Sequence, residues 1–218
     1  MTKVILAGAT GLVGSQVLQH LALLGSKIDL HIVSRRPVSS LPFGVQPHIA
    51  DIAIWPTYVA EIAPNIAISC LGTTIKTSGS KAAFAAVDLD LVITFAKSTK
   101  AAGAAHMIVI SSVGANVTSA NFYLSTKGKA EAALRALEFE RLDILRPGLL
   151  RGNREENRTG KALGIMLSPL TDALLCGPLR RYRSIDSFDV AMAIANLAQC
   201  GGQGEFIHEN DSITALAC

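Results

Sequence analysis

The feature that most constrains the fold of this chain is a run of three glycines near its start, Gly8-Ala9-Thr10-Gly11-Leu12-Val13-Gly14. It follows a short apolar segment, Lys3–Ala7, and opens an apolar segment with helical spacing, Val13–Leu24. In such a strand–turn–helix unit the first glycine permits the tight turn, the second lets the backbone approach a diphosphate, and the third lets the helix pack on the sheet. We expect the exposed amides of this turn to bind phosphates, with Thr10 as an additional hydroxyl donor. A purely structural turn is the alternative.

Short apolar runs alternate with helical patterns along the rest of the chain. The further strand candidates are Asp29–Val33, Val45–Ile49, Ile66–Ser69, His106–Ile110, Arg141–Leu145 and, with a weaker pattern, Glu205–His208. The further helix candidates are Trp55–Ile62, Lys81–Ala102, Tyr123–Leu137 and Asp186–Gln199. This alternation predicts an α/β fold of the Rossmann type, a doubly wound, mostly parallel sheet with helices on both faces. The 218 residues show no repeat and no linker, so we expect a single domain over 1–218.

Composition and charge argue against several classes of protein. The formal net charge of +3 is too small for a nucleic-acid binder, and the short basic run Arg180-Arg181-Tyr182-Arg183 is expected to be a solvated loop. The 4 cysteines and 5 histidines lack metal-ligand spacing, so neither a metal site nor a disulfide framework is expected. We expect Cys70 to be a small core residue and His106 to be an edge residue. With no signal peptide and no membrane-spanning segment in view, we expect a cytosolic protein without a membrane partner.

The residues after the second strand candidate predict which dinucleotide binds. A site for NAD usually carries a carboxylate there for the ribose hydroxyl, but this chain reads Ser34-Arg35-Arg36, and Asp29 stands too early for that role. A guanidinium pairs well with a 2′-phosphate, so the sequence predicts NADP(H) over NAD(H). Two solvated loop arginines are the alternative.

A serine pair, a tyrosine and a lysine form a candidate catalytic group. Ser111-Ser112 follows the strand candidate His106–Ile110, and Tyr123 and Lys127 share one face of the next helix. A lysine ammonium favours the phenolate form of a nearby tyrosine, and a serine hydroxyl can orient a carbonyl oxygen. Together these groups would protonate a carbonyl oxygen while hydride arrives from a nicotinamide. A chance pairing of an exposed Tyr with a solvated Lys is the alternative, because this spacing is common in helices.

Several motifs along the chain carry a resemblance to a known family. They are GATGLVG (8–14), CLGTT (70–74), FAAVDLD (84–90), ISSVGA (110–115), YLSTK (123–127), LRPG (145–148) and DVA (189–191). Together they resemble an atypical short-chain dehydrogenase/reductase, and within that superfamily the small Tat-interacting-protein-like oxidoreductases. The resemblance spans nearly the whole chain.

The resemblance implies roles for particular residues. It implies Tyr123 as the acid/base, Lys127 as its partner and ribose ligand, and Ser111 or Ser112 as the orienting hydroxyl. It further implies a set of cofactor contacts: Asp51 near the adenine, Leu71-Gly72-Thr73 along the cofactor, and Pro147-Gly148 near the nicotinamide. Extended members often carry an Asn where this chain has Val87-Asp88, so a role for that Asn does not carry over. The C-terminal lobe of sugar epimerases is missing, which argues against nucleotide-sugar epimerisation.

These observations favour an NADPH-dependent reductase acting on a small carbonyl compound. A dinucleotide-sensing regulatory or scaffold protein with little catalysis is the second hypothesis, since fold does not fix function. A homodimer is plausible. Three arginines after the sixth strand candidate, Arg151, Arg154 and Arg158, would bind an acidic substrate group or form surface ion pairs. The apolar segment Ile165–Leu175 would cap the cleft, form a dimer face or be buried in the core.

Overall fold

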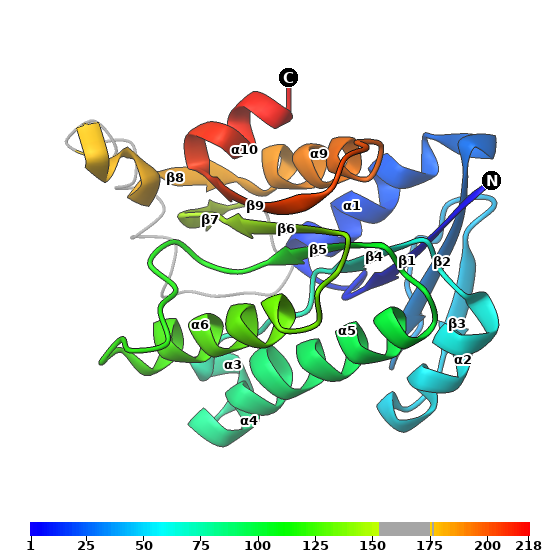
Figure 1. Cartoon of the computed structure of the whole chain (residues 1–218), viewed down its shortest axis with the longest axis horizontal. Helices are drawn as coiled ribbons and strands as arrows, with labels where there is room; N and C mark the ends of the chain where they lie inside the picture. Colours follow the sequence, from blue (N-terminus) through cyan, green and yellow to red (C-terminus); the bar gives the residue numbers. More distant parts are fainter. Residues whose placement is uncertain (153–174, 176) are drawn as a thin grey trace.

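The computed structural model describes residues 1–152, 175 and 177–218. Its main feature is a seven-stranded parallel sheet in the order β3-β2-β1-β4-β5-β6-β9 (Figure 1). The strands are β1 (Thr2–Ala7), β2 (Ile28–Ser34), β3 (Gln46–Ile49), β4 (Ile66–Ser69), β5 (His106–Ile110), β6 (Arg141–Arg146) and β9 (Gly204–Glu209). The Rossmann-type fold predicted from the sequence is therefore confirmed, as are all seven strand candidates to within about two residues.

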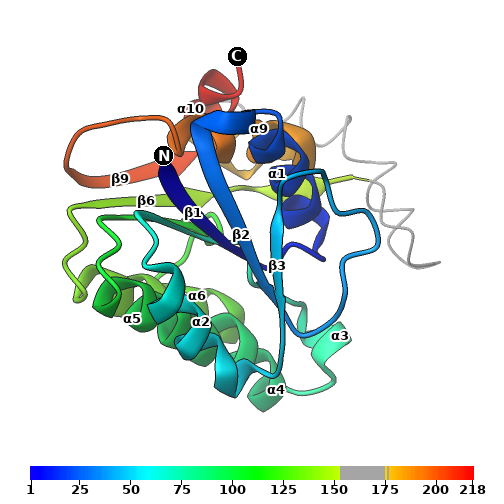
Figure 2. The same ribbon diagram turned by 90° about the vertical axis from the view of Figure 1, so that its right-hand side faces the viewer.

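Helices cover both faces of the sheet, as Figure 2 shows edge-on. One face carries α1 (Leu12–Ala22), α9 (Ser187–Leu197) and α10 (Asn210–Leu216). The other carries α2 (Trp55–Ile62), α5 (Val92–Ala101) and α6 (Phe122–Arg135), with the short helices α3 (Ile75–Ser78) and α4 (Lys81–Ala85) at one end. No helix in the described part of the chain has both the length and the apolar content to cross a bilayer.

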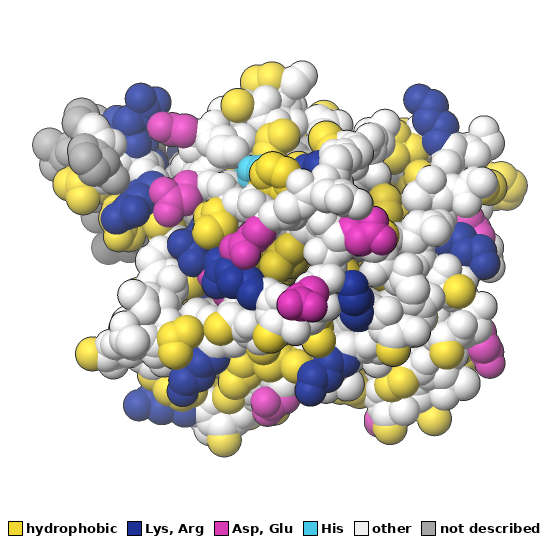
Figure 3. All heavy atoms as spheres, in the orientation of Figure 1, with side chains coloured by type: hydrophobic (Ala, Val, Ile, Leu, Met, Phe, Trp, Pro, Cys, Tyr) yellow, Lys and Arg dark blue, Asp and Glu magenta, His cyan; other side chains and the backbone are white. Residues whose placement is uncertain are grey.

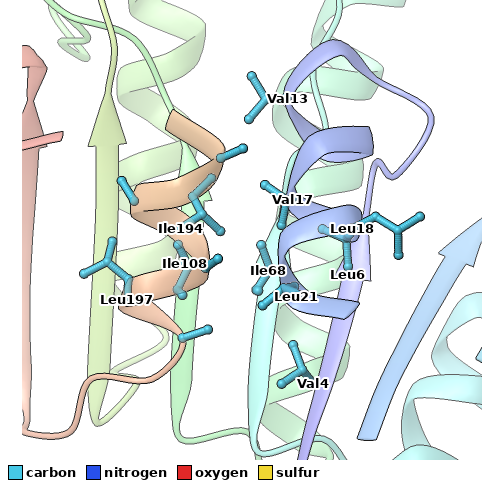
Figure 4. Close-up of a cluster of buried hydrophobic side chains, with 14 of the residues drawn as sticks. Val4, Leu6, Val13, Val17, Leu18, Leu21, Ile68, Ile108, Ile194 and Leu197 are labelled. Atoms are coloured by element: carbon cyan, nitrogen blue, oxygen red, sulfur yellow. The ribbon is translucent and has the colours of Figure 1, made fainter. Parts of the chain in front are cut away.

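Two hydrophobic clusters hold these layers together. Successive residues of a strand point to opposite faces, so Val4 and Leu6 of β1 face α1 and α9, whereas Ile5 and Ala7 face α2 and α5. Figure 4 shows the first cluster, in which Val17 and Leu21 of α1 and Ile194 of α9 pack over the sheet. Because the central strands β1, β4 and β5 are covered on both sides, most of their residues are apolar.

The structure departs from the sequence-based expectation in four places. The helix expected over Lys81–Ala102 is divided into α4, a π-helical segment Ala86–Leu91 (η3), and α5. No helix was predicted within the polar stretch Thr73–Ser80, which contains α3, or after β9, where α10 forms. A second sheet pairs β7 (Leu149–Arg151) with β8 (Ser184–Asp186) beyond the end of β6, and its strands are too short for a visible pattern.

His106 corrects another expectation. It was expected at an edge, but β5 lies between β4 and β6 in the sheet interior, and the residue is buried. Its Nε2 lies 2.7 Å from Asp143 Oδ2, and His208 Nε2 lies 2.7 Å from Asp143 Oδ1. Arg141 donates to the same carboxylate, 2.6 Å from its Nε to Oδ2. A polar cluster thus joins β5, β6 and β9, and this histidine is structural.

Candidate active site

The glycine turn between β1 and α1 is pressed against the end of β4. Gly8 has a φ of +90°, and a Cβ there would lie 2.6 Å from the carbonyl of Cys70. A Cβ on Gly14 would overlap the carbonyl oxygen of Gly8. Gly11 N–H donates to Gly8 O at 3.0 Å, which closes the turn. Neither Gly8 nor Gly14 tolerates a side chain without a backbone shift.

The start of α1 has the character of an anion site. The first hydrogen bond of the helix runs from Ser15 N–H to Gly11 O at 3.0 Å, so the amides of Leu12, Val13 and Gly14 precede it. Gly11 provides no side-chain cap, and the first turn carries no acidic residue. Thr10 beside it is exposed. These amides and the helix dipole fit a phosphate group.

The arginines after β2 lie at the same end of the sheet. Ser34 is buried and shapes their turn, because its hydroxyl donates to Arg36 O at 2.7 Å and accepts from Arg36 N–H at 3.3 Å. Arg35 and Arg36 are exposed, and within the described residues neither forms an ion pair with a carboxylate. Asp29 lies at the opposite end of β2, where it contacts His31 and Gln46.

Asp51 follows the edge strand β3 and is exposed. Its Oδ1 accepts from Ala53 N–H at 3.1 Å and so caps the 3₁₀ helix Ile52–Ile54. If Asp51 contacts the adenine as predicted, it does so with a carboxylate that already accepts a hydrogen bond from Ala53 N–H.

Tyr123 and Lys127 lie on the first turns of α6. Asn121 caps this helix, its Oδ1 accepting from Tyr123 N–H at 2.9 Å. The Tyr123 ring is half-buried and packs on Phe84, with the ring centroids 5.5 Å apart. Lys127 is 6% exposed, and its Nζ lies 2.7 Å from Asp88 Oδ1. This buried lysine is not the solvated residue of the alternative interpretation.

The loop after β4 contacts the ion pair of Lys127 with Asp88. Leu71 is buried, Gly72 is exposed, and Thr73 N–H donates to Asp88 Oδ2 at 2.8 Å. A Cβ on Gly72 would lie 3.4 Å from Asp88 Oδ1 and 3.8 Å from Lys127 Nζ. The structure thus brings Gly72 and Thr73 together with Lys127.

The two serines after β5 have different surroundings. Ser111 is buried and donates to Glu131 Oε1 at 2.5 Å. Arg146 Nε also donates to Glu131 Oε1, at 2.9 Å, and hydrogen bonding to Glu131 raises the pKa of Arg146. Ser112 is half-buried, and its hydroxyl has one long contact of 3.4 Å to Val113 O. Ser112 is therefore the hydroxyl that remains available to a ligand.

The segment Pro147–Gly148 ends β6 beside the basic run. Pro147 O accepts from Val113 N–H at 3.1 Å, and Gly148 N–H donates to Asn210 Oδ1 at 2.8 Å. A Cβ on Gly148 would overlap Arg183 O, so the basic run crosses directly over this glycine. Figure 3 shows basic and acidic side chains interspersed on this side of the molecule, without a large patch of one sign.

Two hollows lie near this end of the sheet. A small cavity of about 10 Å³ is lined by residues that include Asp88, Ser111, Lys127 and Glu131. A surface pocket of about 520 Å³ lies between α10 and the segment before β8, lined by Arg180, Asn210 and Thr214 among others. None of the residues predicted to bind cofactor or substrate lines the larger pocket.

Three further expectations concern Cys70, metal binding and the residues after β6. Burial raises the pKa of the Cys70 thiol to about 12, which keeps it protonated. No three metal-ligating side chains gather within the described residues. Arg151 lies in β7, whereas Arg154, Arg158 and the segment 165–174 fall outside the residues that the structure describes.

Asp88 and Glu131 are the residues that sequence analysis missed. Each is a carboxylate less than 3% exposed that contacts a predicted site residue. Asp88 carried a signal, because it interrupts an apolar helical face between Phe84 and Leu91. Glu131 stands four residues after Lys127 and shares its helix face, which was a weaker signal.

Solved structures share this fold at low sequence identity. UDP-glucose 4-epimerase from Thermotoga maritima has a TM-score of 0.72 at 16% identity, covering 96% of this chain and 77% of the epimerase. The human epimerase family protein SDR39U1, solved with NADPH, has a TM-score of 0.65 at 18% identity, covering 95% of this chain and 74% of that protein. These neighbours confirm the Rossmann-type fold. The resemblance to the short-chain dehydrogenase/reductases, and to the Tat-interacting-protein-like group within them, stays a prediction.

Sequence relatives correct the predicted location. Protein FMP52, mitochondrial, from Debaryomyces hansenii is 38% identical over 153 residues, covering 69% of this chain and 68% of the relative. The protein of the same name from Lodderomyces elongisporus is 31% identical over 215 residues, covering 94% of this chain and 90% of the relative. These names contradict the expected cytosolic location, which was wrong because scattered cysteines indicate only a reducing compartment and not which one. The family model described as HIM1 matches residues 52–175, and this chain belongs to the HIM1 family, with the fungal FMP52 proteins among its relatives.

Proposed function

We propose that this chain is an NADP(H)-dependent oxidoreductase that reduces a small carbonyl compound. The observation that carries the proposal is the buried Lys127, which lies beside the loop Gly72–Thr73 and one helical turn after Tyr123. The glycine turn opens at the same end of the sheet, as expected for ligands of open parallel sheets. Structural neighbours solved with NAD or NADPH support the cofactor class.

The residues present fit a nicotinamide dinucleotide. The amides of Leu12, Val13 and Gly14 would hold the diphosphate, and Arg35 and Arg36 would pair with a 2′-phosphate without competition from a described carboxylate. Lys127 would donate to the nicotinamide ribose. Bound NADPH supplies a hydride for the carbonyl carbon.

In this reaction the side chains of the protein orient the carbonyl oxygen and transfer a proton to it. Ser112 donates a hydrogen bond that orients the carbonyl oxygen, and Tyr123 transfers its phenolic proton to that oxygen. The new C–H and O–H bonds complete an alcohol, and Tyr123 regains its proton from solvent. Ser111 has no direct part, because Glu131 accepts from its hydroxyl.

Substitution of Tyr123 tests the catalytic step. In a panel of carbonyl compounds with NADPH, Tyr123→Phe is expected to lose about 100-fold or more in kcat while keeping the wild-type Kd for NADPH. Tyr58→Phe on α2, whose ring packs on His48, is the matched control with wild-type turnover. Full turnover by Tyr123→Phe on a substrate of the wild type would refute the mechanism.

Cofactor choice is tested by titration of NADPH and NADH. Arg35→Ala and Arg36→Ala together are expected to raise the Kd for NADPH about tenfold and to leave the Kd for NADH unchanged. Arg180→Ala, an exposed arginine on the segment before β8, is the control. If the double variant kept the wild-type preference for NADPH over NADH, neither arginine would determine cofactor choice.

A dinucleotide sensor is the second candidate, and the ion pair of Lys127 with Asp88 favours it. A paired ammonium exerts a weaker field on Tyr123 than a free one would. Tight NADPH binding without turnover on any carbonyl compound would favour the sensor over the oxidoreductase. The names of the FMP52 relatives support a mitochondrial setting, which fractionation of cells that express the chain tests.

A further inference from the structure

Asp88 connects two parts of the candidate site that are distant in sequence. One carboxylate oxygen lies 2.7 Å from Lys127 Nζ on α6, and the other accepts from Thr73 N–H at 2.8 Å in the loop after β4. The residue itself is 1% exposed and belongs to a third element, the π-helical segment η3. A single side chain thus joins α6, η3 and the β4 loop.

The backbone around Asp88 is shaped for this contact. A π-helical turn adds a residue to the local winding of a helix, and such turns are often found at functional sites. Here the irregular turn lies between α4 and α5, which are regular helices, and it carries the buried carboxylate. Asp90, two residues later, is exposed.

The energetics make the pair interdependent. Both side chains are almost removed from solvent, 7% exposed for Lys127 and 1% for Asp88. A buried ammonium without a partner is strongly unfavourable, so each charge requires the other. The hydrogen bond to Thr73 then fixes where the pair lies relative to the loop. Gly72 lies beside the same pair, since a Cβ added to it would be 3.4 Å from Asp88 Oδ1.

We propose that Asp88 is a positioning residue that couples Lys127 to the loop Gly72–Thr73, so that the nicotinamide half of the cofactor binds tightly only when this bridge is intact. The proposal rests on the dinucleotide binding proposed above, but not on catalysis. It assigns no contact with the adenine half, which would bind toward β2 and β3. Loss of the bridge should therefore affect one half of the ligand and not the other.

The test compares two ligands on purified protein. NADPH spans both halves, whereas adenosine 2′,5′-bisphosphate contains only the adenine half with its 2′-phosphate. For Asp88→Asn we expect the Kd of NADPH to rise about tenfold, and that of the bisphosphate to stay within about twofold of wild type. Asp90→Asn makes the same change of charge on the same segment and should bind both ligands like wild type.

A double variant separates positioning from stability. Asp88→Asn combined with Lys127→Met removes the unpaired charge, so its thermal midpoint should recover toward that of the wild type. Its Kd for NADPH should equal that of Lys127→Met alone, because Asp88 acts through Lys127. A further loss of NADPH affinity in the double variant would overturn the proposal. Equal weakening of both ligands by Asp88→Asn, or no weakening of NADPH, would overturn it too. Absence of NADPH binding by the wild type would instead refute the proposed function itself.

Discussion

The hydroxyl of Ser111 donates to the carboxylate of Glu131 at 2.5 Å, and both residues are buried. This bond ties the end of β5 to the middle of α6, one helical turn after Lys127. Arg146 on β6 binds the same carboxylate, and Arg135 reaches it at 3.4 Å. The network therefore fixes the distance between α6 and the sheet beside the candidate site, and it separates the functions of two adjacent serines.

Alanine substitution of the two serines is expected to give opposite results. Ser111→Ala leaves a buried carboxylate with one donor fewer, which should lower the free energy of unfolding by about 1–3 kcal/mol with little change in kcat. Ser112→Ala should leave stability unchanged and lower kcat by about 100-fold, because its hydroxyl orients the carbonyl oxygen. Denaturant unfolding and steady-state kinetics measure the two effects. Loss of turnover in Ser111→Ala alone would reverse the assignment.

The fold was predictable because the buried strands of a parallel sheet are short apolar runs. β1, β4 and β5 are covered on both faces, so apolar residues predominate in their sequences. β8 was not predictable, since its three residues Ser184–Asp186 pair only with β7 and form no periodic pattern. The break in the helix Lys81–Ala102 was also not predicted, because the segment Ala86–Leu91 contains no Gly or Pro that would mark an interruption.

The candidate site was predictable only in its local parts. Tyr123 and Lys127 share one helix, so their spacing alone places them together. The partner of Lys127 comes from another helix, and its contact depends on the π turn that directs Asp88 inward. The preference between Ser111 and Ser112 likewise depends on Glu131, which contacts one of them through the packing of α6 on β5.

Substitution of the third glycine in the turn is expected to be severe. A Cβ on Gly14 overlaps the Gly8 carbonyl oxygen, so Gly14→Ala must move backbone and should cost about 3 kcal/mol of stability. NADPH affinity should fall as well, because the turn carries the amides of the phosphate site. Gly25→Ala is the matched control: its φ is +56° and no atom lies within 4 Å of its Cβ position, so it should cost about 1 kcal/mol and leave binding intact. Similar effects of the two substitutions would contradict this account of the turn.

Cys70 is expected to resist alkylation in the folded protein. Burial raises the pKa of its thiol to about 12, so roughly one molecule in ten thousand carries the thiolate at pH 8. Cys200 and Cys218 are exposed and should react first with iodoacetamide. Peptide mass spectrometry after timed labelling, with a denatured control, measures the order. Labelling of Cys70 as fast as Cys200 would mean that burial does not protect its thiol.

Asp143 should make the stability of the sheet depend on pH. Burial by itself would raise the pKa of its carboxyl, but hydrogen bonds from His106, His208 and Arg141 outweigh burial and hold the pKa below the ordinary aspartate value. A carboxylate whose folded-state pKa is depressed stabilises the fold fully above the unfolded-state pKa of about 3.9. Its contribution is then lost as pH falls toward the folded-state value.

Comparison with Asp143→Asn isolates this contribution. At pH 7 the variant leaves Arg141 buried without a countercharge, and the free energy of unfolding should fall by about 3–5 kcal/mol. Below about pH 5 this difference from wild type should shrink, because the unfolded wild type then takes up a proton that the folded protein excludes. Urea unfolding of both proteins from pH 4 to pH 8 measures the difference. A gap that widens as the pH falls would mean that Asp143 is not held ionised by its three partners.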